Sequence, residues 1–276
     1  MGIRDVVVCA DSSRAMKMTM ELSVDIAGRH DAHLTAIHVI PSLMVPAYAL
    51  YPVGPDLLDA HRQASEDRAR DVRSAFEAAT STMQDTSGWR QVEGDPAREI
   101  CAQSCYADLV VISQPDSRDP ESVSQQVVED VLLGSSAPVL VIPYIGHPCG
   151  PPTHAMVAWD GSRESARAIH DAIPLLASAT RVTVVTVSKN GGDAGKTAAG
   201  TEVAAHLARH GLSVLCREVS SGNLSTSDCL LSLISEESVD FLVMGAYGHS
   251  RLREVVLGGV TDHILRHMTV PVVMSH

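Results

Sequence analysis

Two stretches of this chain each have a second, similar copy later in the sequence. This repeat limits the folds that the chain can adopt. Residues 107–112 (ADLVVI) match residues 239–244 (VDFLVM), and residues 137–141 (APVLV) match residues 270–274 (VPVVM). Self-similarity in the same order along a chain indicates that one structural unit occurs twice. At 276 residues the chain has room for two domains of ordinary size. We therefore expect a tandem duplication.

Each copy alternates short apolar runs with amphipathic segments, the pattern of strands and helices in turn. The runs of the first copy lie at residues 5–10, 34–40, 89–92, 108–112 and 137–143, and those of the second at 155–159, 182–187, 212–219, 241–244 and 270–274. Strands joined through helices favour parallel pairing with right-handed crossovers. We expect an α/β fold of two tandem Rossmann-like domains, each a five-stranded parallel sheet flanked by helices.

The segment 148–152 (PCGPP) is stiff, lacks periodicity and separates the two copies. It predicts a boundary between domains spanning residues 1–147 and 153–276. The last strand of each copy carries a proline near its start, Pro138 or Pro271. Proline is tolerated mainly at strand beginnings and sheet edges, and an open edge is a pairing surface. We expect the two copies to pair these edges within one chain, around a pseudo-twofold axis.

Composition excludes several classes of partner. The formal charge of −12, with no run of Lys or Arg to offset it, disfavours nucleic acid and anionic lipid. No apolar run reaches the roughly 18 residues of a membrane helix, and the N-terminus lacks the pattern of a signal peptide. No two of the six cysteines form a C-x-x-C pair, and we expect all six to be reduced thiols. We expect a cytoplasmic protein with neither nucleic-acid nor membrane partners.

A glycine-rich stretch follows the fourth predicted strand of the second copy. Its spacing is G-x-x-G, nine residues, then G-[small]-x-[Ser/Thr], formed by Gly245, Gly248, Gly258 and Thr261. Glycine allows positive φ and close approach of the backbone to a ligand, and a helix start presents unpaired N–H groups. Open α/β sheets bind ligands beyond the carboxyl ends of their strands. The stretch therefore predicts a phosphate site.

This spacing resembles the nucleotide loop of the universal stress protein family, particularly its ATP-binding members. The order of strands and helices resembles that family along nearly the whole chain. The resemblance implies the adenine nucleotide alpha hydrolase-like form of the fold and ATP as the ligand, with AMP and ADP as alternatives and Mg²⁺ open as a companion ion. One departure is Gly259, which stands where the family usually has Ser or Thr.

In family members like the second copy, ATP lies across the carboxyl ends of the first, second and fourth strands. The resemblance implies ribose or adenine contacts for the Asp160 carboxylate, adenine contacts for the Val187 backbone, and phosphate contacts for the glycine loop. The complete set that it implies is Ala158, Asp160, Val187, Met244, Gly245, Tyr247, Gly248, Gly258, Gly259, Val260 and Thr261. The alternative for residues 160–162 (DGS) is a helix N-cap without a ligand.

The first copy departs from the motif. Asp11 remains, but residues 113–121 (SQPDSRDPE) lack G-x-x-G and place three carboxylates where phosphates would lie. Like charges there repel a nucleotide. We expect one nucleotide site per chain, with the first copy structural or binding something else.

No residue pattern for catalysis or metal binding stands out. Residues 191–197 (GGDAGKT) miss the P-loop spacing, and neither G-x-S-x-G nor H-E-x-x-H occurs. We expect a stress-response regulator that binds a nucleotide rather than an enzyme. The alternatives are a slow ATPase or nucleotide-dependent enzyme of the same fold, and an interaction module without a nucleotide. The Pro-rich apolar segment 41–55 either covers its own domain or forms a homodimer interface.

Overall fold

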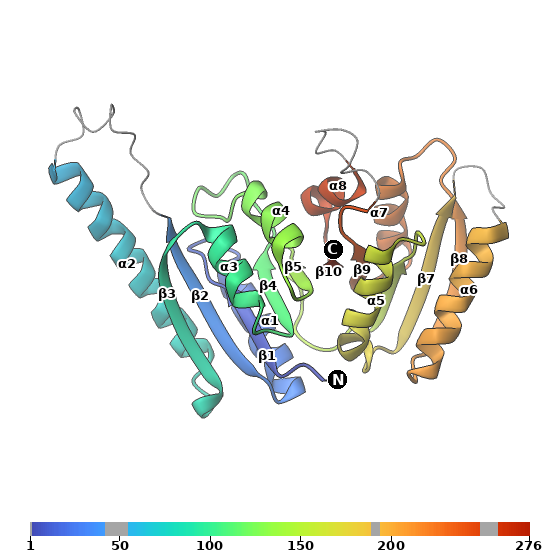
Figure 1. Cartoon of the computed structure of the whole chain (residues 1–276), viewed down its shortest axis with the longest axis horizontal. Coiled ribbons are helices and arrows are strands. Elements are labelled where there is room, and N and C mark those ends of the chain that lie inside the picture. Colours follow the sequence, from blue (N-terminus) through green and yellow to red (C-terminus); the bar gives the residue numbers. More distant parts are fainter. Residues whose placement is uncertain (1, 42–54, 189–193, 249–258) are drawn as a thin grey trace.

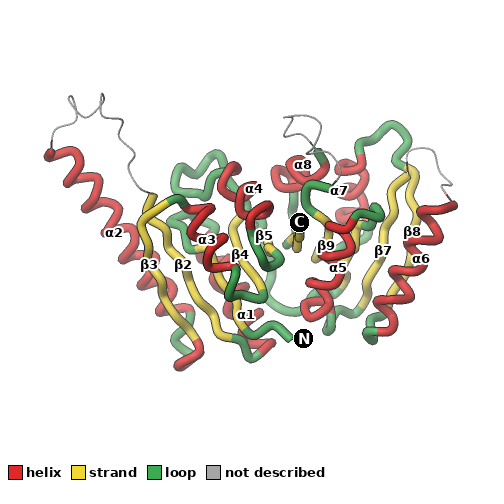
Figure 2. Tube along the Cα trace, in the orientation of Figure 1, coloured by secondary structure: helices red, strands yellow, loops and turns green. Residues whose placement is uncertain are grey.

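A computed structural model describes residues 2–41, 55–188, 194–248 and 259–276 (Figures 1 and 2). The first half contains β1 (Asp5–Cys9), α1 (Met16–His30), β2 (His33–Pro41), α2 (Pro55–Ala79), a 3₁₀ turn (Gln84–Thr86), β3 (Ser87–Gly94), α3 (Pro96–Ser104), β4 (Leu109–Ser113), α4 (Gln125–Gly134) and β5 (Val139–Ile142). The second half contains β6 (His154–Ala158), α5 (Arg163–Leu176), β7 (Arg181–Ser188), α6 (Ala194–Arg209), β8 (Val214–Ser220), α7 (Thr226–Glu236), β9 (Phe241–Gly245), α8 (Val260–His267) and β10 (Val272–Ser275).

All ten strands form one sheet in the order β3-β2-β1-β4-β5-β10-β9-β6-β7-β8. Strands are parallel within each half, and the halves meet where β5 and β10 pair antiparallel, with Val141 opposite Val272. The predicted pairing of the two proline-bearing edges is therefore confirmed. Figure 1 shows the halves side by side, with β5 and β10 in the middle and α2 and α6 at the outer sides.

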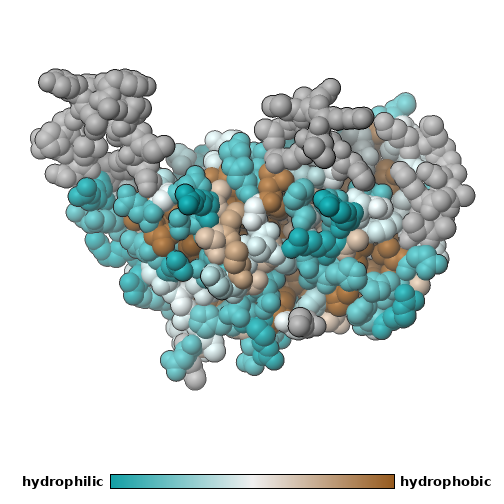
Figure 3. Space-filling model, in the orientation of Figure 1, coloured by the Kyte–Doolittle hydropathy of each residue, from teal (hydrophilic) through white to brown (hydrophobic). Residues whose placement is uncertain are grey.

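Helices cover both faces of the sheet. On one face α1, α2, α5 and α6 pack against alternate strand residues such as Val6 and Val8. On the other face α3, α4, α7 and α8 pack against the intervening residues such as Val7. Period-2 alternation sends successive side chains to opposite faces, so strands buried on both faces are apolar throughout. The described surface in Figure 3 is mostly hydrophilic, with hydrophobic residues in separate patches.

Asp108 and Asp240, the equivalent acidic residues of the sequence repeat, accept equivalent hydrogen bonds in the two halves. Oδ2 of Asp108 accepts hydrogen bonds from the backbone N–H of Arg4 (2.7 Å) and of Asp5 (3.1 Å) at the start of β1. In the second half, Asp240 accepts from the backbone N–H of Thr153 (2.8 Å) and of His154 (3.0 Å) at the start of β6. Each Asp therefore fixes the approach to the first strand of its own half.

One side chain of the first half links the two halves. Gln114, only 1% exposed, donates from Nε2 to the carbonyl oxygen of Leu265 in α8 at 2.8 Å. Its Oε1 accepts from the backbone N–H of Tyr144 at 3.1 Å. The residue after β4 that sequence analysis placed in a degenerate nucleotide loop is thus a structural contact between halves.

Two helices differ from the sequence-based expectations. Helix α4 was not predicted, because only Ser124, its N-cap, and a short apolar stripe mark it. The sequence pattern predicts a helix over residues 202–210, but helix α6 begins at Ala194, eight positions earlier. The apolar segment expected between residues 41 and 55 lies almost wholly outside the described residues. Among the helices described, none is both long and apolar enough to cross a membrane.

Candidate functional site

The carboxyl ends of three neighbouring strands meet in the second half. Strand β6 lies between β7 and β9, with Ala158 opposite Val185 and Val157 opposite Val243. The backbone N–H of Trp159 continues the ladder by donating to the Val185 carbonyl at 2.9 Å. Sheet order therefore brings together the ends of β6, β7 and β9, where five of the predicted site residues lie: Ala158, Asp160, Val187, Met244 and Gly245.

Asp160 lies in the turn from β6 to α5 and stabilises that turn. Its Oδ1 accepts from the backbone N–H (2.9 Å) and from Oγ (2.6 Å) of Ser162, and Ser162 in turn caps α5 by accepting from the Ser165 N–H at 3.0 Å. Burial raises the pKa of Asp160, but hydrogen bonding, chiefly from the hydroxyl and the backbone N–H of Ser162, outweighs it and holds that pKa below its usual range. Among the described residues, Oδ2 of Asp160 accepts no hydrogen bond.

Gly245 is required by packing and not by a left-handed turn. A Cβ at this position would lie 2.5 Å from the backbone N of Ser165 and 2.7 Å from the carbonyl carbon of Glu164. Its absence lets the end of β9 rest directly on the first turn of α5. A Cβ at Gly248 would meet only ordinary contacts, the nearest at 3.7 Å from Glu164 Oε2 and Ser162 Cβ.

The positive φ in this loop belongs to Tyr247 (+51°), whereas the described loop glycines Gly245, Gly248 and Gly259 lie outside the left-handed region. The expectation that glycines supply the positive φ here is wrong for these three. Thr261 Oγ1 accepts the Tyr247 N–H at 3.2 Å and thereby holds the turn against α8. A hydroxyl that accepts in this way still has its own O–H to donate.

Helix α8 begins at Val260 with Gly259 as its N-cap, and no described side chain caps it. A Cβ at Gly259 would meet no atom of the described residues within 4 Å, and the φ of −150° at Gly259 suits any residue. Each of α3, α4, α5 and α7 instead has a capping Asp or Ser that accepts a backbone N–H of the first turn. The remaining predicted site residue, Gly258, lies outside the described residues.

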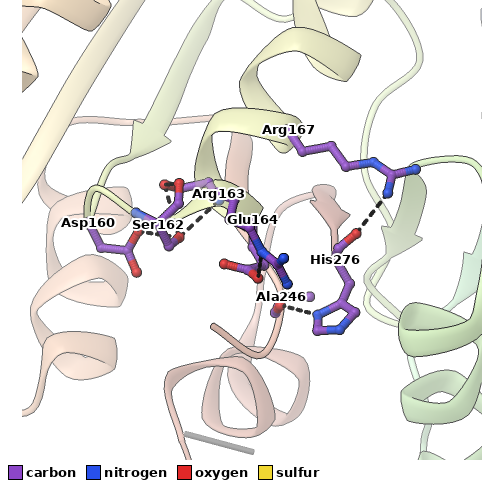
Figure 4. A network of polar contacts seen from close by, with 8 residues as sticks. Asp160, Ser162, Arg163, Glu164, Arg167, Ala246 and His276 are labelled. Atoms are coloured by element: carbon purple, nitrogen blue, oxygen red, sulfur yellow. Dashed lines mark hydrogen bonds and ion pairs between the residues drawn. The ribbon is translucent and has the colours of Figure 1, made fainter. Parts of the chain in front are cut away.

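Two residues near the loop were not found by sequence reasoning. Glu164, with a side chain 8% exposed, lies beneath Gly248; hydrogen bonding to its own backbone N–H and to Arg163 holds its pKa below the usual range. The ring Nδ1 of His276 lies 3.0 Å from the Ala246 carbonyl oxygen, and Ala246 N–H donates to Ser275 O at 2.9 Å. Figure 4 shows Asp160 and Ser162 at one end of this network and His276 at the other. Only the complete fold brings these residues together.

At the same position in the first half, the aspartate binds a second segment of the same half. Asp11 Oδ1 accepts from the N–H (3.0 Å) and Oγ (2.6 Å) of Ser13, just as Asp160 does with Ser162. Here, however, Oδ2 also accepts the backbone N–H of Val123 at 3.0 Å. Burial raises the pKa of Asp11 above its ordinary value of 3.8, and hydrogen bonds from Ser13 and Val123 offset only part of that rise.

The three carboxylates after β4 all have partners within the first half. Asp116 pairs with Arg118 (Oδ1 to Nε, 2.9 Å), and Glu121 pairs with Arg68 (Oε2 to Nε, 3.5 Å). Asp119 accepts the backbone N–H of Arg14 at 2.8 Å, at the turn before α1. The segment after β4 therefore folds back over the end of β1, and its acidic residues hold it there.

One family model matches each half of the chain separately. The model of the universal stress protein family matches residues 2–143 and again residues 152–276. The chain belongs to the universal stress protein family. It carries two universal stress protein domains in tandem, which agrees with the family resemblance of the sequence.

Solved structures give the same architecture for the whole universal stress protein chain. A universal stress protein from Archaeoglobus fulgidus superposes with a TM-score of 0.72 at 18% identity, covering 98% of this chain and 95% of that one. A protein of unknown function from Pseudomonas aeruginosa superposes with a TM-score of 0.60 at 16% identity, covering 99% and 92%. At these identities the likeness concerns the fold.

Curated relatives match only locally. A universal stress protein from Synechocystis is 46% identical over 37 residues, 13% of each chain. A universal stress protein from Methanocaldococcus jannaschii is 31% identical over 45 residues, 16% of this chain and 28% of the relative. The matched segments thus span less than a third of either relative.

Proposed function

We propose that the second universal stress protein domain binds an adenine nucleotide, ATP in the first place, and that the chain acts as a stress-response regulator without turnover. The observation that carries the proposal is the placement of α8. Its N-terminus has no side-chain cap among the described residues and is tied to the Tyr247 turn through Thr261. Unpaired N–H groups and the helix dipole at such an end favour a phosphate.

The rest of the nucleotide has a place at the adjoining strand ends. Asp160 Oδ2 has no partner among the described residues and suits a ribose hydroxyl, while the backbone at Val187, two residues beyond the Ala158–Val185 pair, suits adenine. Met244 and Gly245 end the neighbouring strand β9 and would flank the sugar. Gly248, Gly258, Gly259 and Val260 would surround the phosphates, with the Thr261 hydroxyl donating to them. A divalent ion such as Mg²⁺ would accompany the triphosphate.

Substitutions at Gly259 test this assignment with little structural cost, because a Cβ there meets no neighbour among the described residues. Gly259→Asp would cap α8 while placing a carboxylate among the phosphates. We expect ATP affinity, measured by titration calorimetry, to fall at least about a hundredfold, since two unit charges about 4 Å apart interact by about 4 kcal/mol at an effective dielectric of 20. Gly259→Ser supplies a hydroxyl without charge and should bind ATP several-fold more tightly than wild type, as one added hydrogen bond contributes about 1 kcal/mol.

Gly259→Ala is the matched control and should leave the affinity within about a factor of three. Asp160→Asn should weaken binding, whereas Asp11→Asn, its counterpart in the first domain, should not. AMP and ADP titrated in parallel rank the nucleotides. Equal affinity in the Asp, Ser and Ala variants would contradict the phosphate assignment, and phosphate release that Gly259→Asp abolishes would favour a slow ATPase.

A further inference from the structure

The first domain contains a cavity of about 350 Å³ at the carboxyl ends of β1, β2 and β4. Residues from six secondary-structure elements line it, including Ile37 of β2, Ile100 of α3, Ile112 of β4 and Val127 of α4. Its volume lies at the small end of the range of about 300–1,000 Å³ that ligand pockets occupy. The proposed nucleotide site of the second domain does not account for this cavity.

The lining of the cavity is mostly apolar. Ile37, Ile100 and Ile112 are all buried, and Cys9, whose thiol pKa is raised well above its ordinary range by burial, adds a neutral sulfur. Because the transfer of apolar surface out of water is favourable in free energy, such a lining favours a ligand with an apolar body.

The charged groups at the cavity disfavour an anion. Asp11 and Glu121 contribute two carboxylates against the single guanidinium of Arg68, which is already paired with Glu121 at 3.5 Å. The two helix N-termini nearby are capped: Asp95 accepts the Arg98 N–H in α3, and Ser124 accepts the Val127 N–H in α4. A phosphate would therefore meet negative charge and helix starts whose donors are partly taken.

The polar group best placed to recognise a ligand is His38, a lining residue that is 7% exposed. Its Nδ1 lies 2.7 Å from the Ala10 carbonyl oxygen, and its ring stacks on Trp89 with centroids 5.8 Å apart. A carbonyl oxygen only accepts, so Nδ1 carries a proton, and in the tautomer protonated at Nδ1 alone Nε2 is an acceptor. No hydrogen bond reaches Nε2 from the residues described. The cavity thus offers an acceptor to a ligand that donates.

We propose that the first domain binds a small uncharged ligand with an apolar body and a hydrogen-bond donor, in the cavity bounded by Ile37, His38, Ile100 and Val127. The tandem chain would then carry two sites of different chemistry, one for a nucleotide and one for a neutral molecule. This proposal does not depend on nucleotide binding in the second domain, because it rests on contacts within the first domain alone.

Three probes that share one ring system test the chemistry on the full chain. 2-Naphthol is neutral with one O–H donor, 2-methoxynaphthalene lacks the donor, and 2-naphthoate carries a negative charge at pH 7. In fluorescence titrations we expect 2-naphthol to bind at least fivefold more tightly than 2-methoxynaphthalene and at least tenfold more tightly than 2-naphthoate. Equal or tighter binding of 2-naphthoate would overturn the proposal.

Methyl NMR of isoleucine-labelled protein locates the probe. 2-Naphthol should shift the methyl signals of Ile37, Ile100 and Ile112 and leave that of Ile264 in α8 unchanged. Shifts confined to the second domain, or ATP shifting the three first-domain signals, would contradict the assignment. These signals distinguish failure of this site from failure of the nucleotide site.

A pair of variants on α4 completes the test. Val127→Trp places a large side chain at the cavity and should weaken 2-naphthol binding at least tenfold. Gln126→Trp, exposed on the same turn, is the matched control and should bind within about twofold of wild type. If Val127→Trp retains full affinity, the probe does not occupy this cavity. If Val127→Trp fails to fold, the relative affinities of the three probes and the methyl signals of the wild-type protein test whether 2-naphthol binds in this cavity.

Discussion

The backbone N–H of Val123 donates a hydrogen bond of 3.0 Å to Oδ2 of Asp11, across more than a hundred residues of chain. The equivalent oxygen of Asp160 has no partner among the described residues, although Oδ1 of both aspartates binds a serine two positions on. One carboxylate thus binds the segment after β4 with its second oxygen, and the other has that oxygen unpaired among the described residues. The two halves of the chain therefore differ in structure at this pair of residues.

The two aspartates should give stability a pH dependence of opposite sign. Asp11 has a folded-state pKa above its ordinary 3.8. The stability that this shift contributes is therefore fully present below pH 3.8 and is lost as pH rises through the folded-state pKa. Asp160 has a lowered pKa, so its contribution is present above pH 3.8 and is lost as pH falls through the folded pKa.

Urea unfolding of Asp11→Asn and Asp160→Asn between pH 3 and 6 measures this. The stability advantage of wild type over Asp11→Asn should shrink as pH rises, and its advantage over Asp160→Asn should grow. Slopes of the same sign would show that the two environments do not differ as described.

Gly245→Ala should destabilise the fold by about 1–3 kcal/mol, because its Cβ would lie 2.5 Å from the backbone N of Ser165 and backbone atoms must shift to relieve the overlap. Gly248→Ala, where the nearest contacts are 3.7 Å away, is the control and should change the free energy of unfolding by less than about 0.5 kcal/mol. The midpoints of denaturant unfolding of the two variants, compared with wild type, measure these losses of stability. Equal losses would mean that Gly245 is not the packing position.

Gln114→Ala should cost about 2–3 kcal/mol of unfolding free energy, because it removes the partners of the Leu265 carbonyl and the Tyr144 N–H at once. Gln103→Ala removes only the exposed bond from Arg90 and should cost little. Thermal unfolding of both variants provides the comparison. A neutral Gln114→Ala would show that Gln114 does not stabilise the contact between halves.

Thr261→Val should weaken ATP binding about tenfold, whereas Thr261→Ser should stay within about threefold of wild type. Valine keeps the shape of threonine but removes both the acceptor for the Tyr247 N–H and the hydroxyl that would donate to phosphate. Amide exchange at Tyr247 should be faster in the valine variant and unchanged in the serine variant. Wild-type exchange and affinity in Thr261→Val would exclude both roles of the hydroxyl.

The sequence predicted the repeat, all ten strands and the pairing of β5 with β10, because apolar runs and the positions of Pro138 and Pro271 are local signals. The family resemblance of the sequence also implied that Asp160 and Gly245 would lie at neighbouring strand ends, and β6 and β9 are paired neighbours in the sheet. The N-cap reading of residues 160–162 is confirmed through Ser162, and it coexists with an open Oδ2 on Asp160.

Other features could not be predicted because they arise from contacts distant in sequence. The need for glycine at residue 245 comes from the first turn of α5, about 80 positions earlier. The hydrogen bond from Val123 to Asp11 joins residues 112 positions apart, and the sequence of the preceding acidic segment suggested only repulsion of phosphate. The left-handed backbone of Tyr247, which precedes Gly248, is likewise accompanied by a hydrogen bond to Thr261, 14 positions later.

The most direct test of the central claim is a crystal structure of the full chain grown with excess ATP and Mg²⁺. We predict nucleotide density at the carboxyl ends of β6, β7 and β9, with phosphates at the N-terminus of α8 and no nucleotide in the first domain. An empty second domain, or a nucleotide bound beside Asp11, would contradict the account.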